Sequence, residues 1–319
     1  MKRRMEDMMP KINKVLIVGA GAIGAAIASR IFDVNPDAVA LAASGERKQR
    51  YLRDGFIVNG KRYDFRLADS AGATLYDLII LAVKNYDLES AIEEIRPFVG
   101  ENTTILSLLN GITSEQILRA EFGKDAVPLA FIIGIDALRE GNRIDFPRPG
   151  EIRFGDEKND SDNLRPAIAE IADFLKSHNV PYSIPNDMVR AMWYKFMMNV
   201  GLNQWSAVLR APYGVFQKNA IARDLVRETM EEVVALGIQR GVAISSADID
   251  SLFTILDTLG PEGKTSMLQD VEAQRKTEVD AFAKVVVDEA SCSGIPVPAN
   301  AMLFRMISCI EQSYADLAR

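Results

Sequence analysis

The chain has 319 residues, of which 48% are hydrophobic and 25% are charged, and its formal net charge is −7. This length and apolar content are enough for two packed domains, while the acidic balance argues against a nucleic-acid or anionic-membrane partner. No segment reaches the roughly 18 consecutive apolar residues of a membrane span, so we expect a soluble, cytoplasmic protein.

The N-terminal part of the chain alternates short apolar runs with helical patterns. Residues 1–13 are charged and lack the apolar core of a signal peptide, so we expect a disordered lead-in. The predicted helices cover residues 22–32 and 87–98. The predicted strands are residues 14–19, 38–43, 77–83, 103–109, 127–135 and 151–154. Strands that alternate with helices predict a Rossmann-type, doubly wound sheet over residues 1–186.

From residue 187 to residue 319 the pattern is almost entirely helical. The predicted helices are residues 188–208, 220–241, 247–259, 266–289 and 299–318. The fold class is therefore α/β, with a Rossmann-type domain followed by an all-helical domain (187–319), and the ligand is expected in the cleft between them. The helices at 220–241 and 266–289 are long enough to form a homodimer face, and equally to form domain core.

Cysteine and histidine offer little chemistry in this chain. The two cysteines, Cys292 and Cys309, are too few for a disulfide framework, and we expect both to be reduced and structural. The one histidine, His178, falls in a turn after a helix, where we expect it on the surface and outside catalysis. We predict no metal site.

A glycine-rich turn follows the first strand and opens the first helix. The sequence Gly-Ala-Gly-Ala-Ile-Gly that begins at Gly19 fits the dinucleotide-binding pattern in the context that confirms it. Gly19 permits the tight turn, Gly21 lets the backbone approach a pyrophosphate, and Gly24 lets the helix pack on the strand. The N–H groups of the helix start, at Ala22 and Ile23, then face the phosphates. The alternative is a glycine turn without a ligand.

The end of the second strand distinguishes the two nicotinamide cofactors. NAD usually requires an acid there for the ribose 2′-hydroxyl, but this strand runs into Ser44 without one. Arg47 follows, with Lys48 and Arg50, and can hold a 2′-phosphate by charge-assisted hydrogen bonds, which favours NADP(H). Two alternatives stay open: the basic cluster is a solvated helix start, or Glu46 serves as the acid if the strand is longer.

A polar row interrupts the apolar helix predicted at residues 188–208. Lys195, Asn199 and Asn203 are spaced four and four, so they share one helix face. Three buried polar groups are costly unless something satisfies them. A carbonyl substrate would do so, with the lysine as proton donor and the amides as hydrogen-bond partners. The alternative is an exposed polar stripe on an ordinary helix.

Together these motifs resemble the ketopantoate reductases over nearly the whole chain. The lysine-asparagine row and the Ser-Met-Leu-Gln-Asp segment that starts at Ser266 are the most specific elements. The Thr-Glu-Val-Asp segment with Glu278, the Asn-Gly pair at Asn110 and the strand end at Lys84 also match. The resemblance implies NADPH-dependent reduction of 2-dehydropantoate to (R)-pantoate, in the route to pantothenate and coenzyme A.

The resemblance also implies a role for each matching residue. Lys195 would be the general acid, and Glu278 would hydrogen-bond beside it in the active site. The residues expected to bind the substrate are Asn199, Asn203, Ser266 and Asn110. The residues expected at the cofactor are Gly19, Gly21, Ala22, Ile23, Gly24, Ser44, Arg47, Lys84, Asn110 and Glu278.

Several of these residues have a purely structural alternative. Ser266 begins a Ser-x-x-Gln pattern, which is a helix capping box. Glu278 follows two basic residues and fits a surface ion pair, while Asn110 precedes glycine in a turn signal and Lys84 can be solvated at its strand end. On a straight helix Ser266 and Glu278 would lie about 18 Å apart. Both reach one substrate only if Ser266 precedes the helix or the chain bends between them.

Two departures from the family pattern fall near the substrate side. Gln204, followed by Trp205, stands where the family usually has proline, and residues 281–284 read Ala-Phe-Ala-Lys where it often has a glycine-containing stretch. They motivate a second hypothesis, a related reductase of another small 2-oxo acid. A third hypothesis is an NADP-binding regulator without turnover. That protein would be expected to lack the lysine or the asparagines, and all three are present.

Overall fold

The computed structural model describes residues 12–68 and 74–317 of the chain. The chain divides into two compact units, unit 1 with Met1–Leu109 and Thr113–Met188, and unit 2 with Asn110–Ile112 and Val189–Arg319. Sequence patterning gives no sign that three residues after a strand of unit 1 belong with the helical unit.

The lead-in expected over residues 1–13 lies outside the described residues, except for its last two. Ile12 packs against the apolar core of unit 1. The Asn13 backbone N–H donates to Asp77 Oδ2 at 2.8 Å. The expectation of disorder is therefore wrong for these two residues.

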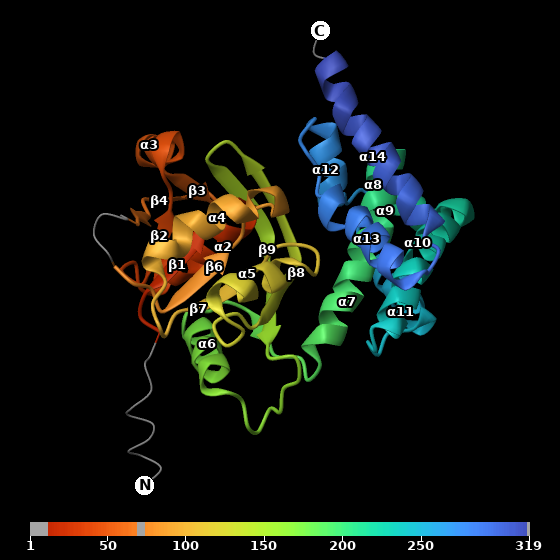
Figure 1. The fold of residues 1–319 in the computed structure, drawn as a ribbon. Helices are drawn as coiled ribbons and strands as arrows, with labels where there is room; N and C mark the ends of the chain where they lie inside the picture. The colour runs from red at the N-terminus through yellow and green to blue at the C-terminus, as the bar shows by residue number, and fades with distance from the viewer. Residues whose placement is uncertain (1–11, 69–73, 318–319) are drawn as a thin grey trace. The chain divides into compact units, whose positions relative to one another are not determined.

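Unit 1 contains a five-stranded parallel sheet in the order β5-β2-β1-β6-β7 (Figure 1). Its strands are β1 (Val15–Val18), β2 (Val39–Ala42), β5 (Arg66–Leu67), β6 (Leu78–Leu81) and β7 (Thr104–Ser107). The helices of unit 1 are α2 (Ala22–Val34), α3 (Gly45–Asp54), α4 (Leu88–Ile95), α5 (Ser114–Phe122) and α6 (Pro166–Ser177), with the 3-10 turns η2 (Asn85–Asp87) and η3 (Arg96–Phe98). Because β1 lies between β2 and β6, the strand order reverses beside β1, which is where such sheets bind ligands.

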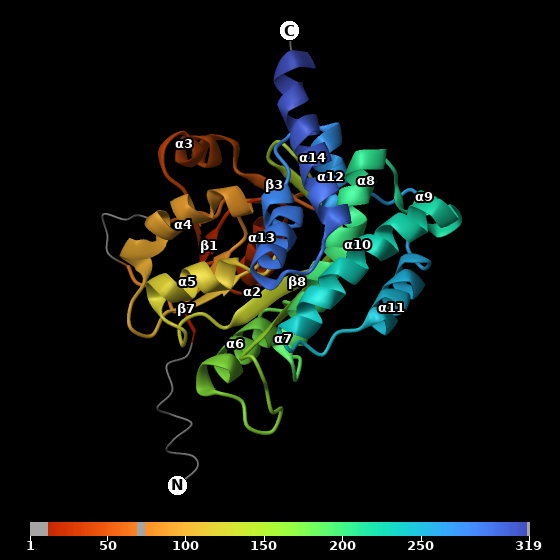
Figure 2. The same cartoon turned by 45° about the vertical axis from the view of Figure 1, so that its right-hand side comes forward.

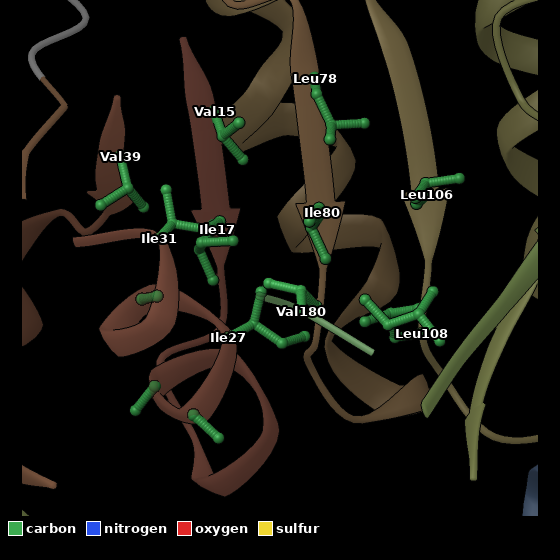
Figure 3. Packing of buried hydrophobic residues seen from close by; sticks show 14 of the residues in the cluster. Val15, Ile17, Ile27, Ile31, Val39, Leu78, Ile80, Leu106, Leu108 and Val180 are labelled. Carbon is green, nitrogen blue, oxygen red and sulfur yellow. The ribbon is translucent and has the colours of Figure 1, made fainter. Parts of the chain in front are cut away.

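Both faces of the sheet are buried at β1, β2 and β6, which is why these three strands are uninterrupted apolar runs. On one face, Ile17 and Val39 lie in one apolar cluster with Ile27 and Ile31 of α2 (Figure 3). The other face, which includes Leu16, packs against α4 and α5. The three-layer arrangement confirms the predicted Rossmann-type domain and fixes the glycine turn at the carboxyl end of β1.

A second, mixed sheet completes unit 1. Its strands are β3 (Phe56–Val58), β4 (Lys61–Tyr63), β8 (Leu129–Glu140), β9 (Arg143–Gly155) and β10 (Tyr182–Ser183). Their order is β10-β9-β3-β4, with β8 paired to β9. The prediction that residues 127–135 and 151–154 extend the doubly wound sheet is therefore wrong. They belong to the antiparallel β8–β9 hairpin, which pairs along nearly its whole length.

Unit 2 is helical, as predicted. Its helices are α7 (Met188–Met198), α8 (Gln204–Leu209), α9 (Tyr213–Lys218), α10 (Ala220–Gln239), α11 (Ser246–Leu256), α12 (Ser266–Glu272), α13 (Ala283–Ser293) and α14 (Pro298–Leu317), with the π-helical turn η4 (Asn199–Asn203) and the 3-10 turn η5 (Val279–Ala281). α10 contacts α11, α13 and α14 (Figure 2). One face of α10, including Val226 and Val233, is core of the unit, while Ile221 and Ile238 are exposed. Within residues 12–68 and 74–317, no helix has the length and apolarity needed to cross a membrane.

The single helix predicted over residues 266–289 is wrong, because the chain leaves the helix after α12. Gln274 adopts a left-handed conformation at φ +51°. The backbone N–H and the Oγ1 of Thr277 both donate to Glu311 on α14, each at 2.6 Å. These bonds hold a non-helical segment between α12 and η5.

The histidine and the two cysteines also differ from their predicted settings. His178 does end α6, but it is buried, and its ring stacks on Phe174 with centroids 4.0 Å apart. The ring Nδ1 lies 2.8 Å from the carbonyl oxygen of Phe174. Cys292 and Cys309 are free and exposed, so neither is a structural core residue.

Candidate active site

The glycine turn of unit 1 has the geometry that a dinucleotide loop requires. Gly19 has φ +91°, and a Cβ there would lie 2.6 Å from the Ala82 carbonyl oxygen. A Cβ on Gly24 would lie 2.1 Å from the Gly19 carbonyl oxygen, so a side chain would push α2 off β1. A Cβ on Gly21 would meet nothing within 4 Å. The turn thus excludes side chains at its two structural positions and leaves space at the third.

The first turn of α2 is open to an anion. Gly21 is the N-cap residue and offers no side-chain cap, and no acid lies in the first turn. The N–H groups of Ala22 and Ile23 belong to this turn, where an α-helix has no internal partners for them. The partial positive charge at such a helix start attracts phosphate groups.

An arginine that the sequence analysis missed lies beside this turn. Arg139, near the end of β8, donates from Nη1 to the Ala20 carbonyl oxygen at 2.8 Å and from Nε to the Gly141 carbonyl oxygen at 2.9 Å. Its guanidinium therefore adds positive charge next to the glycine turn. No sequence signal marks it, because the β8–β9 hairpin brings it there over more than a hundred residues of chain.

The basic segment after β2 is a helix, α3. Ser44 is its N-cap residue and is exposed. β2 ends at Ala42, so Glu46 lies in the first turn of α3 and not at the strand end, which removes the predicted alternative of a longer strand. Arg47 Nη2 donates to both carboxylate oxygens of Glu94 on α4, at 2.7 and 2.6 Å. Arg47 is thus an oriented cation rather than only a solvated charge.

Lys84 lies close in sequence to the backbone on which the glycine turn packs. The Ala82 N–H donates to the Val18 carbonyl oxygen at 2.8 Å, and Ala82 and Val83 are the neighbours of Gly19. Lys84 follows them as the N-cap residue of η2 and is half-buried. The predicted lysine therefore extends from the same edge of the sheet as the glycine turn.

Asn110 links the two charged residues of the predicted catalytic group, all within unit 2. Lys195 Nζ donates to Asn110 Oδ1 at 3.1 Å, and Asn110 Nδ2 donates to Glu278 Oε2 at 2.9 Å. Asn199 Nδ2 lies 3.5 Å from the same Asn110 oxygen. One amide side chain thus orients an ammonium group and a carboxylate at its opposite ends.

The burial of these residues decides between the alternatives that the sequence left open. Lys195 is 8% exposed, Asn199 is 5% and Asn203 is 8%, so they are not an exposed polar stripe. Glu278 is 4% exposed, so it is not a surface ion-pair residue. Buried polar and charged groups are costly unless they are paired. Asn110 supplies such pairing for Lys195, Asn199 and Glu278 in unit 2.

The π-helical turn η4 carries both asparagines of the row. A π-turn inside an α-helix is rare and occurs frequently at functional sites. A Cβ on Gly201 would lie 2.5 Å from Met230 Cγ, so this glycine lets α10 approach the wide turn closely. The helix that carries Lys195 is thus widened where the two amides are presented.

Ser266 starts α12, which packs against η4. The predicted capping box at Ser266 is wrong, because Thr265 is the N-cap residue and its Oγ1 accepts from the Leu268 N–H at 3.1 Å. Ser266 is exposed, and its hydroxyl is not needed for the cap. Ser266 thus begins a helix that packs against the turn with the two asparagines.

The bend between α12 and η5 answers the geometric question raised by the sequence. Ser266 and Glu278 are not on one straight helix, so the separation of about 18 Å does not apply. Thr277, 1% exposed and bonded to Glu311, places Glu278 at the start of η5. No signal in the sequence marks Glu311, which the fold brings to this segment from α14.

The first departure from the family pattern, Gln204 with Trp205, is packed within unit 2, whereas the second ends at Lys284, which is exposed. Gln204 is fully buried, and its side chain bonds the Val200 carbonyl and the Ala283 N–H. Trp205 Nε1 donates to Thr229 Oγ1 on α10 at 2.8 Å. That these residues reshape the substrate side therefore stays a prediction. In the described part of the chain, no group of three or more His, Cys, Asp or Glu side chains is arranged to hold a metal ion.

Comparisons with known proteins match this organisation. Residues 15–159 match the family model described as ketopantoate reductase PanE/ApbA, and residues 187–311 match the model of its C terminal. A 2-dehydropantoate 2-reductase from Pyrococcus horikoshii is 23% identical over 302 residues, which cover 93% of this chain and 97% of that protein.

Solved structures share the fold over the same length. A PanE/ApbA family ketopantoate reductase from Ralstonia eutropha JMP134 has a TM-score of 0.81 at 24% identity, covering 94% of this chain and 99% of that one. A D-mandelate dehydrogenase with NADH and anilino(oxo)acetate has a TM-score of 0.84 at 20% identity, covering 94% and 98%. Both likenesses show the fold.

Proposed function

Because the chain belongs to the ketopantoate reductase family, we propose that it reduces 2-dehydropantoate to pantoate with NADPH, as a step toward pantothenate and coenzyme A. The buried chain of hydrogen bonds from Lys195 through Asn110 to Glu278 carries the proposal. The substrate is taken from the relative in Pyrococcus horikoshii, which is a 2-dehydropantoate 2-reductase.

Lys195 is the general acid of the proposed reaction. As the ketone is reduced, negative charge develops on its oxygen, and an ammonium group held at that oxygen stabilises the charge and donates the proton. Asn110 fixes the Lys195 side chain through its Oδ1, and Glu278 fixes Asn110 through its Nδ2. The carboxylate also balances the lysine charge within a buried group.

The two asparagines of η4 and Ser266 supply hydrogen bonds to the rest of the substrate. A 2-oxo acid carries a carboxylate beside its ketone, and 2-dehydropantoate also carries a hydroxyl. Side-chain amides can donate to one of these groups and accept from the other. Asn199 and Asn203 are buried at 5% and 8% exposure, where such bonds exclude water and fix orientation.

The residues of unit 1 fit a dinucleotide. NADPH, when bound, supplies the hydride. The space at Gly21, the uncapped start of α2 and the Arg139 guanidinium fit a pyrophosphate, and Arg47 on α3 fits a 2′-phosphate. Ser44 and Lys84 complete the set proposed to contact the cofactor.

A second candidate is the reduction of another 2-oxo acid. The D-mandelate dehydrogenase likeness favours it, because that protein has the same fold and is seen with NADH and anilino(oxo)acetate. The same Lys195 chemistry would serve, and only the side-chain surroundings of the substrate would differ.

The experiment that separates these candidates is a steady-state assay of NADPH oxidation by the purified protein. 2-Dehydropantoate is compared with phenylglyoxylate and other 2-oxo acids, with NADH as the alternative cofactor. Turnover with 2-dehydropantoate and NADPH supports the proposal. Turnover only with another acid supports the second candidate, and no turnover despite tight NADPH binding would support a regulator.

Gly21→Ala will raise the Kd for both NADPH and NADH by roughly tenfold or more, because the new methyl group occupies the space proposed for the pyrophosphate. The backbone of Gly21 has φ −73° and ψ −161°, which alanine adopts without strain, and nothing lies within 4 Å of the added Cβ. The melting temperature should therefore stay unchanged. Cofactor titrations by fluorescence test this, with Gly260→Ala as the control, since its Cβ also meets nothing within 4 Å. Wild-type affinity in Gly21→Ala would contradict the placement.

Arg47→Ala will raise the Kd for NADPH by about 10- to 100-fold and leave that for NADH nearly unchanged, because a charge-assisted bond to the 2′-phosphate is lost. Arg53→Ala is the matched control, since Arg53 lies in the last turn of α3 and pairs with Asp54 at 2.7 Å. The two Kd values are compared by titration. An equal loss for both cofactors would show that Arg47 does not read the 2′-phosphate.

A further inference from the structure

Gln204 is a fully buried polar residue that uses both ends of its side-chain amide. Its Nε2 donates to the Val200 carbonyl oxygen at 2.7 Å, and its Oε1 accepts from the Ala283 N–H at 3.2 Å. It is 0% exposed. A buried amide with both ends bonded joins the elements that it touches.

The first of these bonds belongs to the π-helical turn. Val200 lies inside η4, and in an α-helix its carbonyl would accept from the backbone N–H of residue 204. In a π-turn the backbone N–H groups pair five residues back instead of four. The Gln204 side chain therefore supplies a donor to a carbonyl that the wider turn takes out of the α-helical pattern.

The second bond belongs to the segment that carries Glu278. Ala283 is the first residue of α13, and Phe282, its N-cap residue, makes no side-chain cap. Gln204 Oε1 takes that role from a different helix. The turn η5 comes just before α13, and Glu278 is the N-cap residue of η5. One side chain thus joins the turn with Asn199 and Asn203 to the segment with Glu278.

The surroundings of Gln204 keep it in place. Asn300 is also 0% exposed, and its Oδ1 lies 3.5 Å from Gln204 Nε2. Asn300 Nδ2 donates to Glu232 Oε2 at 2.7 Å, and Glu232 also accepts from the N–H groups of Ala299 and Asn300 at the start of α14. The amide of Gln204 is therefore part of a network that spans four helices.

We propose that Gln204 is a positioning residue for the reduction, which holds the two asparagines at a fixed spacing from Glu278. This role rests on the proposed function. Displacement of catalytic groups by about 1 Å can cost roughly 100-fold in rate. Loss of the two bonds should therefore be felt in catalysis and not only in stability.

The test compares Gln204→Met with Gln217→Met in the full-length protein. Methionine keeps the size of the side chain and removes the bonds. Gln217 is the matched control, because its Nε2 donates to the Leu256 and Leu259 carbonyl oxygens, both at 2.9 Å, away from the catalytic group. Gln204→Glu is the second variant, which keeps an acceptor for the Ala283 N–H and loses the donor to Val200.

For Gln204→Met we expect kcat/KM for the 2-oxo acid to fall by about 10- to 100-fold, with KM raised, while the NADPH Kd stays within about twofold. Gln204→Glu should lose at least as much, because its buried carboxylate would face the Val200 carbonyl oxygen. Gln217→Met should lose thermal stability with unchanged kinetics. Wild-type kcat and KM in a folded, thermally weakened Gln204→Met would overturn the inference alone. A wild-type protein without turnover on any 2-oxo acid would overturn the proposed function, and this role with it.

Discussion

Replacing Lys195 by methionine will lower kcat by about three orders of magnitude, while NADPH binds as in the wild type. General acid catalysis contributes roughly 100- to 10,000-fold, and the ammonium group also stabilises the developing alkoxide. Lys195 is 8% exposed and its Nζ donates to Asn110 Oδ1 at 3.1 Å, so bulk water has little access to act as the proton donor in its place. Because the lysine acts mainly in the transition state, the loss should fall on kcat rather than on KM.

Two further variants show whether the loss of kcat comes from the missing proton donor at Lys195. Lys195→Arg keeps the positive charge but does not release a proton at neutral pH, so it should also bind the substrate and show little turnover. Lys284→Met is the control, since Lys284 is exposed on α13 and pairs with Asp288 at 2.5 Å. Steady-state kinetics and NADPH titration are measured for all three. Near-normal turnover in Lys195→Met would remove Lys195 from the mechanism.

The contribution of Glu115 to the free energy of unfolding will fall by about 3 kcal/mol as the pH rises from about 4.5 to about 7. Glu115 is 2% exposed in the first turn of α5. Burial raises the pKa of its carboxyl from 4.5 to about 7, against the opposing bond from Ser114 Oγ at 3.0 Å. The folded state therefore holds a proton that the unfolded state has released, and this stabilisation is present at low pH and lost as the pH rises through about 7.

Glu115→Gln should remove this pH dependence, since the amide is neutral throughout and keeps an acceptor for Ser114. At pH 8 the variant should be more stable than the wild type by about 2–3 kcal/mol. Urea unfolding is followed by far-UV circular dichroism, because both tryptophans, Trp193 and Trp205, lie in unit 2 and would not report on unit 1. Glu101→Gln, at an exposed residue of unit 1, is the control. Parallel pH profiles for wild type and Glu115→Gln would contradict this assignment.

Much of the fold is predictable from the sequence, because local pattern and final burial agree there. The strands β1, β2 and β6 are buried on both faces, so each is a short apolar run. The β8–β9 hairpin is different: β9 contains Pro147, Pro149 and Gly150, which local rules assign to loops. Its long pairing with β8 is decided by a partner strand and not by its own pattern.

Tertiary contacts also explain why residues 266–289 do not form the single helix that their sequence predicts. The sequence between α12 and η5 has no proline or glycine to end a helix. The break is stabilised by Glu311, 34 residues beyond Thr277 in the chain. The error for His178 has a local cause, because the turn signal does not show that its ring stacks on Phe174, four residues earlier in the chain.

The candidate site also contains residues that local sequence pattern predicts and residues that it does not predict. Lys195, Asn199 and Asn203 follow from helical spacing in an apolar segment, and the glycine turn follows from its strand and helix context. Glu278 came only from the resemblance. The roles of Arg139, Glu311 and Gln204 depend on contacts between distant segments, for which a single sequence carries no signal.

The most direct test of the account is a competition experiment. The purified protein and NADPH are given equal concentrations of 2-dehydropantoate, phenylglyoxylate and other 2-oxo acids, and the hydroxy acids formed are quantified by mass spectrometry. Product ratios then report the ratios of kcat/KM directly. We expect pantoate to form first and in excess. Mandelate or another hydroxy acid as the main product, with pantoate absent, would contradict it.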